Sequence, residues 1–297
     1  MSNAKGAGFR AYLDPRMRVM LTLGFSSGLP FLMVGNTLGY WLREDGVSLT
    51  AIGLLSGVGL AYSLKFLWAP VIDRVRAPFF GRLGRRRGWM ALSQIVIAFG
   101  LIAMAWVGVA AGPTLLGLAA LVVAFFSATQ DIVIDAWRIE SAKTVEELGL
   151  LTSAATFGYR VAMLAADALI LIVADQIGWR QSYILYGVLM SAGLMATFLA
   201  EESPTAAAAL EDKENAAPLW TLKGLGDAIA GPFVAFFKAH GWLALLMLTA
   251  IAFYRLPDFF MGPMCNPFYH DLGLSKTAVG EVRGWIAGME PKVGLTR

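Results

Sequence analysis

Two carboxylates lie at the end of a long apolar run. The run begins near Leu115 and closes with Asp131 and Asp135, which are four residues apart. It is long enough to cross a hydrocarbon core of ~30 Å as a helix, and on that helix the two side chains share one face. An ionised Asp near the bilayer centre costs roughly 2.5 to 3.5 kcal/mol, so each needs a polar partner, a watery cavity or a proton. Such a pair is suited to taking up and releasing protons.

Other ionisable side chains also share helix faces inside apolar runs. Arg160 and Asp167 are seven residues apart, so on a helix they are nearly eclipsed and ~10.5 Å apart along the axis. Tyr62 and Lys65 are three apart on one side of another run. Because Arg is always charged and its planar fork suits a carboxylate, Arg160 is a candidate contact for an anion.

These residues form two candidate groups. We expect proton-coupling groups at Asp131, Asp135 and Asp167, and substrate-binding groups at Arg160, Lys65, Gln130, Tyr62 and Arg255. Static alternatives stay open: Arg160 paired with an Asp, Asp167 paired with a basic residue, and Lys65 reaching for the membrane interface.

The elements that must position these groups are apolar helices. Hydrophobic residues make up 57% of the 297 residues, charged residues only 15%, and the mean hydropathy is +0.62. These values are far from those of a soluble domain and predict an all-α, polytopic membrane protein. Seven apolar runs are expected to span, at residues 17–41, 49–72, 88–109, 115–137, 150–174, 183–200 and 242–260.

The basic residues predict the orientation. Fifteen lie in the segments on the side of the N-terminus, whereas the opposite loops hold only Arg43, Arg180 and Lys276. This asymmetry places the N-terminus and the acidic end of run 115–137 in the cytoplasm. We expect no removable signal peptide, and the single cysteine, Cys265, excludes an intrachain disulfide framework.

Several motifs, in order, resemble the muropeptide permease (AmpG) family of the major facilitator superfamily. They are GFSSGLP at 24–30, KFLWAP at 65–70, RRRGW at 85–89, SATQDIVIDAW at 127–137, GYR at 158–160 and GPMCNPFYHDLG at 262–273. The later motifs are also similar to acetyl-coenzyme A transporters. The resemblance covers residues 12–284.

The resemblance implies a domain organisation. A cytoplasmic segment at 1–16 precedes a six-helix bundle at 17–200, a cytoplasmic linker at 201–240 and the start of a second bundle at 241–297. Residues 220–240 of the linker are compatible with an amphipathic helix on the membrane surface. The loop between the second and third helices carries the family's acidic and basic residues, which imply conformational gating by Asp73, Arg74, Arg85, Arg86 and Arg87.

The resemblance also implies a function. It is the proton-driven import of N-acetylglucosaminyl-1,6-anhydro-N-acetylmuramyl peptides across the bacterial inner membrane, for peptidoglycan recycling. The partners would be this substrate, protons and membrane lipid, with no cofactor, no metal and no nucleic acid. An enzyme embedded in the membrane is disfavoured, because no Ser or Cys lies beside a His and no metal-ligand spacing occurs.

One departure from the family pattern concerns the second half. Residues 285–292 do not continue an apolar helix of spanning length, so helix 8 is expected to be absent or only begun, and the chain to be truncated. Three interpretations stay open: a muropeptide importer, with any missing half supplied by another chain; an acetyl-coenzyme A type or other anionic-solute transporter; and a fragment that does not transport.

Overall fold

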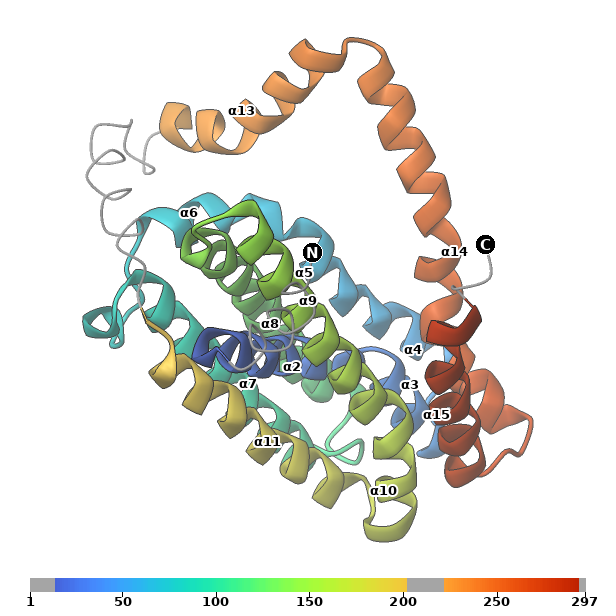
Figure 1. Ribbon diagram of the computed structural model, residues 1–297. Helices are drawn as coiled ribbons and strands as arrows, with labels where there is room; N and C mark the ends of the chain where they lie inside the picture. The colour runs from blue at the N-terminus through green and yellow to red at the C-terminus, as the bar shows by residue number, and fades with distance from the viewer. Residues whose placement is uncertain (1–13, 202–221, 294–297) are drawn as a thin grey trace.

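The structure, a computed structural model, describes residues 14–201 and 222–293, and within the second range it describes only some of the side chains. Every regular element in these ranges is helical (Figure 1). The elements are α2 (Pro15–Val34), α3 (Asn36–Glu44), α4 (Leu49–Leu55), η1 (Ser56–Gly59), α5 (Leu60–Leu64), η2 (Lys65–Leu67), α6 (Ala69–Arg74), η3 (Gly81–Leu83), α7 (Arg85–Val107), α8 (Pro113–Ser141), α9 (Val145–Leu164), η4 (Ala165–Leu169), α10 (Ile170–Ile177), α11 (Trp179–Leu199), α13 (Leu222–His240), α14 (Leu243–Asp271) and α15 (Lys276–Val293).

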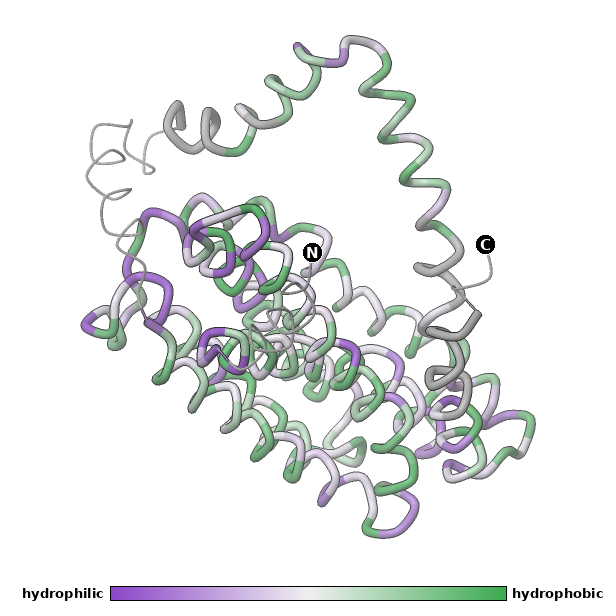
Figure 2. The backbone as a smooth tube through the Cα atoms, viewed as in Figure 1, coloured by the Kyte–Doolittle hydropathy of each residue, from purple (hydrophilic) through white to green (hydrophobic). Residues whose placement is uncertain are grey.

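Six helical stretches in the described ranges are long and apolar enough to cross a membrane. Apolar residues continue along these stretches in Figure 2. A seventh span arises if Ile229–His240 and Leu243–Tyr254, which meet at 113°, are taken together. The expected fold class is therefore confirmed. The six are Pro15–Glu44, Leu49–Leu67, Arg85–Val107, Pro113–Ser141, Val145–Ile177 and Trp179–Leu199.

The second span differs from the regular helix expected over 49–72. It is a series of short α-helical and 3₁₀ segments, from α4 to α6. Gly53 lies in α4, Gly57 and Gly59 lie in the first 3₁₀ turn, and Pro70 is the second residue of α6. Glycine favours a regular helix less than other residues do, and proline suits only a first turn, so these residues interrupt the i to i+4 hydrogen bonding.

The predicted helix ends also move. The third helix begins at Arg85 instead of 88, so Arg85, Arg86 and Arg87 form its first turn. The fourth extends to Ser141 instead of 137, which places Glu140 on the helix. Both changes bring charged residues onto helix ends that face each other, where Arg85 and Arg86 pair with Glu140.

Helix α2 packs against α9, α8 and α11. Its closest approach is to α9: a Cβ at Gly24 would collide with the carbonyl oxygen of Ala155, and one at Gly158 with that of Leu21. Small residues allow this approach of two backbones in a membrane, where the hydrophobic effect does not drive helices together. Gly28, one turn after Gly24, continues the contact, because a Cβ there would lie 2.7 Å from the carbonyl oxygen of Tyr159.

The last helices contact the bundle at one end. Helix α14 packs against α3, and α15 packs against η4 and α10. Figure 1 shows the start of α14 standing away from the bundle, while the end of α14 and α15 lie against it. Helix α13 contacts the second span, where Phe233 packs on Phe66 with ring centroids 5.5 Å apart. Residues 202–221 of the expected linker lie outside the described residues.

Candidate functional site

A pocket of about 180 Å³ opens between α2, α8 and α9, and both acidic residues of the fourth span line it. Their shared helix face, predicted from the four-residue spacing, is thus the face that meets this pocket. Residues from three helices surround the two carboxylates: Met20, Gly24, Ser27, Asp131, Ile134, Asp135, Arg138, Ala155, Thr156 and Tyr159.

Asp131 is the more enclosed of the two carboxylates. Its Oδ1 accepts a hydrogen bond from the hydroxyl of Ser27 on α2, and its Oδ2 lies 3.8 Å from Nζ of Lys65. The Asp131 side chain is only 18% exposed. A carboxylate held between a hydroxyl and an ammonium group has the polar partners that its depth in the membrane requires.

Asp135 has a different environment. Its side chain is 52% exposed and forms an ion pair of 3.0 Å with Arg138, one turn further along α8. A local pair of this exposure contributes little to stability. The two carboxylates therefore share a pocket, but only Asp131 is linked to other helices.

Gln130 and Tyr62 do not line the pocket. The Gln130 amide is fully buried and donates to Oγ of Ser26 at 2.9 Å, on the side of α8 that faces the bundle interior. Gln94 of α7 lies 3.4 Å from the same hydroxyl. Tyr62 packs edge-to-face on Phe31, with ring centroids 4.9 Å apart. This geometry does not present either residue to a substrate in this pocket.

The candidate cations and Asp167 lie apart from one another. Arg160 is exposed on α9, next to Tyr159 of the pocket lining. Asp167 lies in η4, a turn of π-helix, and forms an ion pair with Arg283 of α15. Asp167 thus pairs with a basic residue, as the static alternative expected, and that residue is Arg283, which was not among the predicted site residues. The side chain of Arg255 lies outside the described residues.

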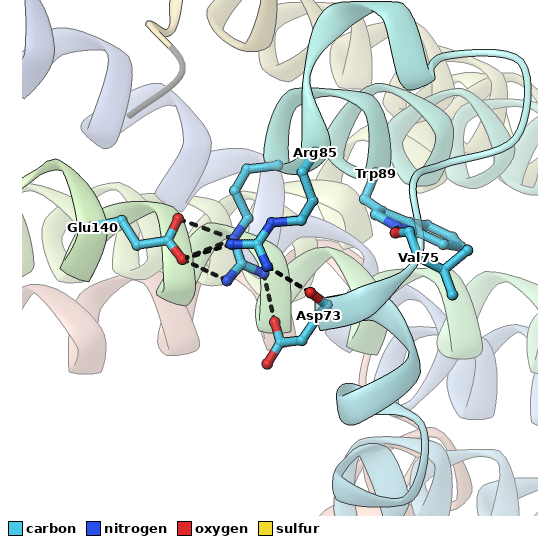
Figure 3. Close-up of polar contacts among 6 residues, drawn as sticks. Asp73, Val75, Arg85, Trp89 and Glu140 are labelled. Atoms are coloured by element: carbon cyan, nitrogen blue, oxygen red, sulfur yellow. Dashed lines mark hydrogen bonds and ion pairs between the residues drawn. The ribbon is translucent and has the colours of Figure 1, made fainter. Parts of the chain in front are cut away.

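Three of the five residues expected to act in gating, Asp73, Arg85 and Arg86, form a charge cluster with Glu140 (Figure 3). Arg86 forms ion pairs of 2.6 Å with both Asp73 and Glu140. Arg85 donates to the carbonyl oxygen of Asp73 at 2.5 Å and pairs with Glu140 at 3.2 Å. Both Arg side chains are buried. The cluster ties the end of α6 to the start of α7 and the end of α8.

Glu140 was not among the predicted site residues. The sequence placed it in a loop after a helix ending at 137, and the extra turn of α8 is what aims it at the two arginines. Its signal in the sequence was an acidic residue just after the end of an apolar run.

The remaining members of the predicted group lie around this cluster. Arg87 donates to the carbonyl oxygens of Thr197 and Phe198, in the last turn of α11. Those carbonyls have no partner within their own helix, and a cation there also complements the helix dipole. Arg74 is the last residue of α6.

Six apolar spans in the described ranges, a pocket with partnered carboxylates and a charge cluster joining three helix ends define a polytopic helical membrane protein. The chain belongs to the Major Facilitator Superfamily, to which residues 20–289 match. It is 35% identical over 288 residues to the anhydromuropeptide permease of Escherichia coli strain K12, covering 96% of this chain and 55% of that one. The predicted resemblance to muropeptide permeases is confirmed.

Two further relatives have similar coverage. The chain is 30% identical over 286 residues to a putative transporter AmpG 4 of Rickettsia felis, covering 94% of this chain and 66% of that protein. It is 34% identical over 271 residues to an uncharacterized protein of Haemophilus influenzae, covering 90% and 60%. The chain thus spans between about half and two thirds of the length of these relatives. Those relatives whose names state an activity are permeases or transporters.

Proposed function

We propose that this chain takes part in proton-coupled import of anhydromuropeptides across the bacterial inner membrane. The observation that carries this proposal is the acidic pocket on α2, α8 and α9, in a chain 35% identical to an anhydromuropeptide permease. Muropeptides carry sugar hydroxyls and peptide carboxylates. The pocket offers carboxylate, hydroxyl and aromatic groups for the first, and cations stand close by for the second.

Asp131 is the proposed proton carrier. In the unprotonated state it holds Lys65 through the 3.8 Å ion pair. Protonation removes this negative partner, and the Lys65 ammonium then attracts a carboxylate of the substrate instead. Proton binding and substrate binding are thereby coupled through a single cation. Asp135 is exposed and pairs within its own helix, so it contributes less to this coupling than Asp131 does.

The charge cluster supplies a gate at the end of the bundle that carries the N-terminus. Alternating access requires one bundle to move against another around a central site. Asp73, Arg86 and Glu140 hold α6, α7 and α8 together at that end. Removal of Arg86 leaves Asp73 without its ion-pair partner and Glu140 paired with Arg85, and breaking a buried pair is strongly destabilising. Basic residues concentrated at this end orient it to the cytoplasm under the positive-inside rule.

Another anionic solute, such as an acetyl-coenzyme A type substrate, would also be attracted by Lys65 and Arg160. We expect muropeptide because the first relative carries that name. The direct test is uptake of labelled anhydromuropeptide into energised membrane vesicles that contain this chain, with and without a protonophore. Asp131→Asn is the matched variant, and labelled acetyl-coenzyme A is the competing substrate.

Protonophore-sensitive uptake of muropeptide by the unchanged chain, lost in Asp131→Asn, supports the proposal. Uptake of acetyl-coenzyme A alone contradicts the proposed substrate. A third outcome is that well-inserted protein shows no uptake, and that uptake is regained when the remaining helices of the Escherichia coli permease are co-expressed. This outcome would mean that the chain holds the substrate site but does not complete the transport cycle alone.

A further inference from the structure

Asp167 and Arg283 form an ion pair between η4 of the first bundle and α15, the last helix that the structure describes. Nη1 of Arg283 donates to Oδ1 of Asp167, and the side chains are 18% and 24% exposed, respectively. Asp167 precedes the end of α10 at Ile177 by ten residues, or ~15 Å of helix. Asp167 therefore lies inside the apolar span Val145–Ile177 and away from both of its ends.

Local geometry brings the two charges together. At Gly280, one turn before Arg283, a Cβ would lie 2.6 Å from the carbonyl oxygen of Ala168 and 2.9 Å from Cγ1 of Ile172. The glycine therefore lets the backbone of α15 approach η4. Asp167 itself lies in the π-helical turn, a feature that occurs frequently at functional sites. The guanidinium of Arg283 is also 5.4 Å from the ring centroid of Tyr269.

Stability alone is a weak reason for this pair. Replacing a buried ion pair by packed apolar residues is often neutral or stabilising, because both charges lose their hydration. The pair also joins two parts of the fold that alternating access must separate. When they separate, Arg283 stays charged within the membrane and needs another anion.

The transported molecule can supply that anion. Thr156 of the pocket precedes Asp167 by eleven residues, or ~16 Å along the helix. Arg160 is exposed between them. A tripeptide alone spans roughly 10 Å when extended, so a sugar-linked peptide is long enough to occupy the pocket with its sugars and reach Arg283 with its terminal acids.

From these relations we propose that Arg283 binds a carboxylate of the substrate, and that Asp167 occupies Arg283 when no substrate is bound. This proposal rests on the function proposed above and extends it to a second anchoring point. It assigns Arg283 to the terminal carboxylates of the peptide, and the Asp131 pocket to the sugars and to the peptide carboxylate nearest them, which Lys65 attracts. The bidentate fork of Arg matches a carboxylate in a way that Lys does not.

The test measures equilibrium binding to the whole chain in lipid nanodiscs. The probes are tritiated anhydromuropeptide with a free tripeptide and the same compound with its peptide carboxylates amidated. The variants are Arg283→Gln, Arg283→Lys, Asp167→Asn and the double variant. Arg180→Gln is the control, because Arg180 lies over the ring of Trp106, outside the proposed path.

We expect Arg283→Gln to weaken binding of the acidic probe at least about tenfold, as loss of a charged hydrogen bond does. Asp167→Asn should bind this probe several-fold more tightly, because Arg283 no longer has a competing partner. Arg283→Lys should bind with intermediate affinity. The amidated probe should not distinguish Arg283→Gln from the unchanged chain, and the control should bind normally.

Equal weakening by Asp167→Asn and Arg283→Gln, relieved in the double variant, would overturn the proposal, since a static tie between helices predicts it. Normal binding of the acidic probe by Arg283→Gln would do so as well. Both results leave the proposed function intact, because the unchanged chain binds. If the unchanged chain binds neither probe, both the proposed function and this extension are contradicted.

Discussion

The carboxylate of Asp131 accepts a hydrogen bond from the hydroxyl of Ser27, 104 positions earlier in the chain. This bond links α2 to α8 at the pocket, and its acceptor is the same side chain that pairs with Lys65. One acidic group thus contacts two other helices, whereas Asp135 contacts only its own. The difference predicts unequal effects of neutralising them.

We predict that Asp131→Asn abolishes protonophore-sensitive uptake in vesicles, whereas Asp135→Asn retains a substantial part of it. The amide of Asn cannot take up a proton, and it releases Lys65 permanently. The Asp135 side chain is 52% exposed and forms its ion pair with Arg138 of the same helix, so its loss disturbs little else. Equal uptake by the two variants, at equal amounts of inserted protein, would remove Asp131 from the proposed coupling role.

The contact between α2 and α9 predicts an effect on stability. Gly24→Ala or Gly158→Ala places a methyl group against a backbone carbonyl oxygen of the other helix. We expect each to reduce the free energy of unfolding by about 1 to 3 kcal/mol, as overpacking does. The measurement is thermal unfolding of detergent-purified protein. Gly57→Ala is the control, since no described atom lies within 4 Å of a Cβ there. A similar melting temperature for all three would contradict the close approach.

The charge cluster predicts a larger loss. Arg86→Ala removes the ion-pair partner of Asp73 and leaves Glu140 paired with Arg85, and breaking a buried pair costs about 3 to 5 kcal/mol. Arg86→Lys should recover only part of this loss, because an ammonium cannot form the paired bonds that Nε and Nη2 make with Glu140. Thermal unfolding compares both variants with Glu140→Gln. Full stability of Arg86→Ala would show that the cluster does not hold the helix ends together.

The opposite end of the bundle predicts a dependence on pH. The hydrogen bonds from Arg43 hold the pKa of Asp271 below its ordinary value of 3.8, and His270 adds to this effect. A lowered pKa means that the contact stabilises the folded arrangement fully above about pH 4. That stabilisation is lost as the pH falls through the lower, folded-state value. The contact joins α3 to the end of α14, with a closest distance of 2.6 Å.

Spin labels at Leu49 and Leu272, both exposed, can report on this contact once Cys265 is replaced by Ser. We expect a narrow distance distribution at pH 7 that broadens below about pH 4. In Asp271→Asn, the distance distribution should be broad already at pH 7. This substitution should not separate the helices at this end completely, because Lys276 of α15 also pairs with Glu44 of α3 at 2.9 Å. A narrow distribution in Asp271→Asn would show that Arg43 and Asp271 do not control this end.

Six of the seven expected spans follow from the sequence because length and hydropathy are local properties. The shared face of Asp131 and Asp135 does too, since it depends only on helix periodicity. Gln130 shows the limit of that reasoning. It is adjacent to Asp131 but rotated about 100° around the helix, and only the positions of α2 and α7 show that this face is interior.

The sequence by itself therefore determined the membrane-spanning helices, the acidic face of the fourth helix and the resemblance to muropeptide permeases. The tertiary structure decided the partners: Ser27 and Lys65 for Asp131, Arg283 for Asp167, and Glu140 for Arg86. Hydropathy and periodicity act over one helix, within a few turns. Ion pairs across 54 to 116 positions depend on how helices pack and where they end, which no single segment of the chain specifies.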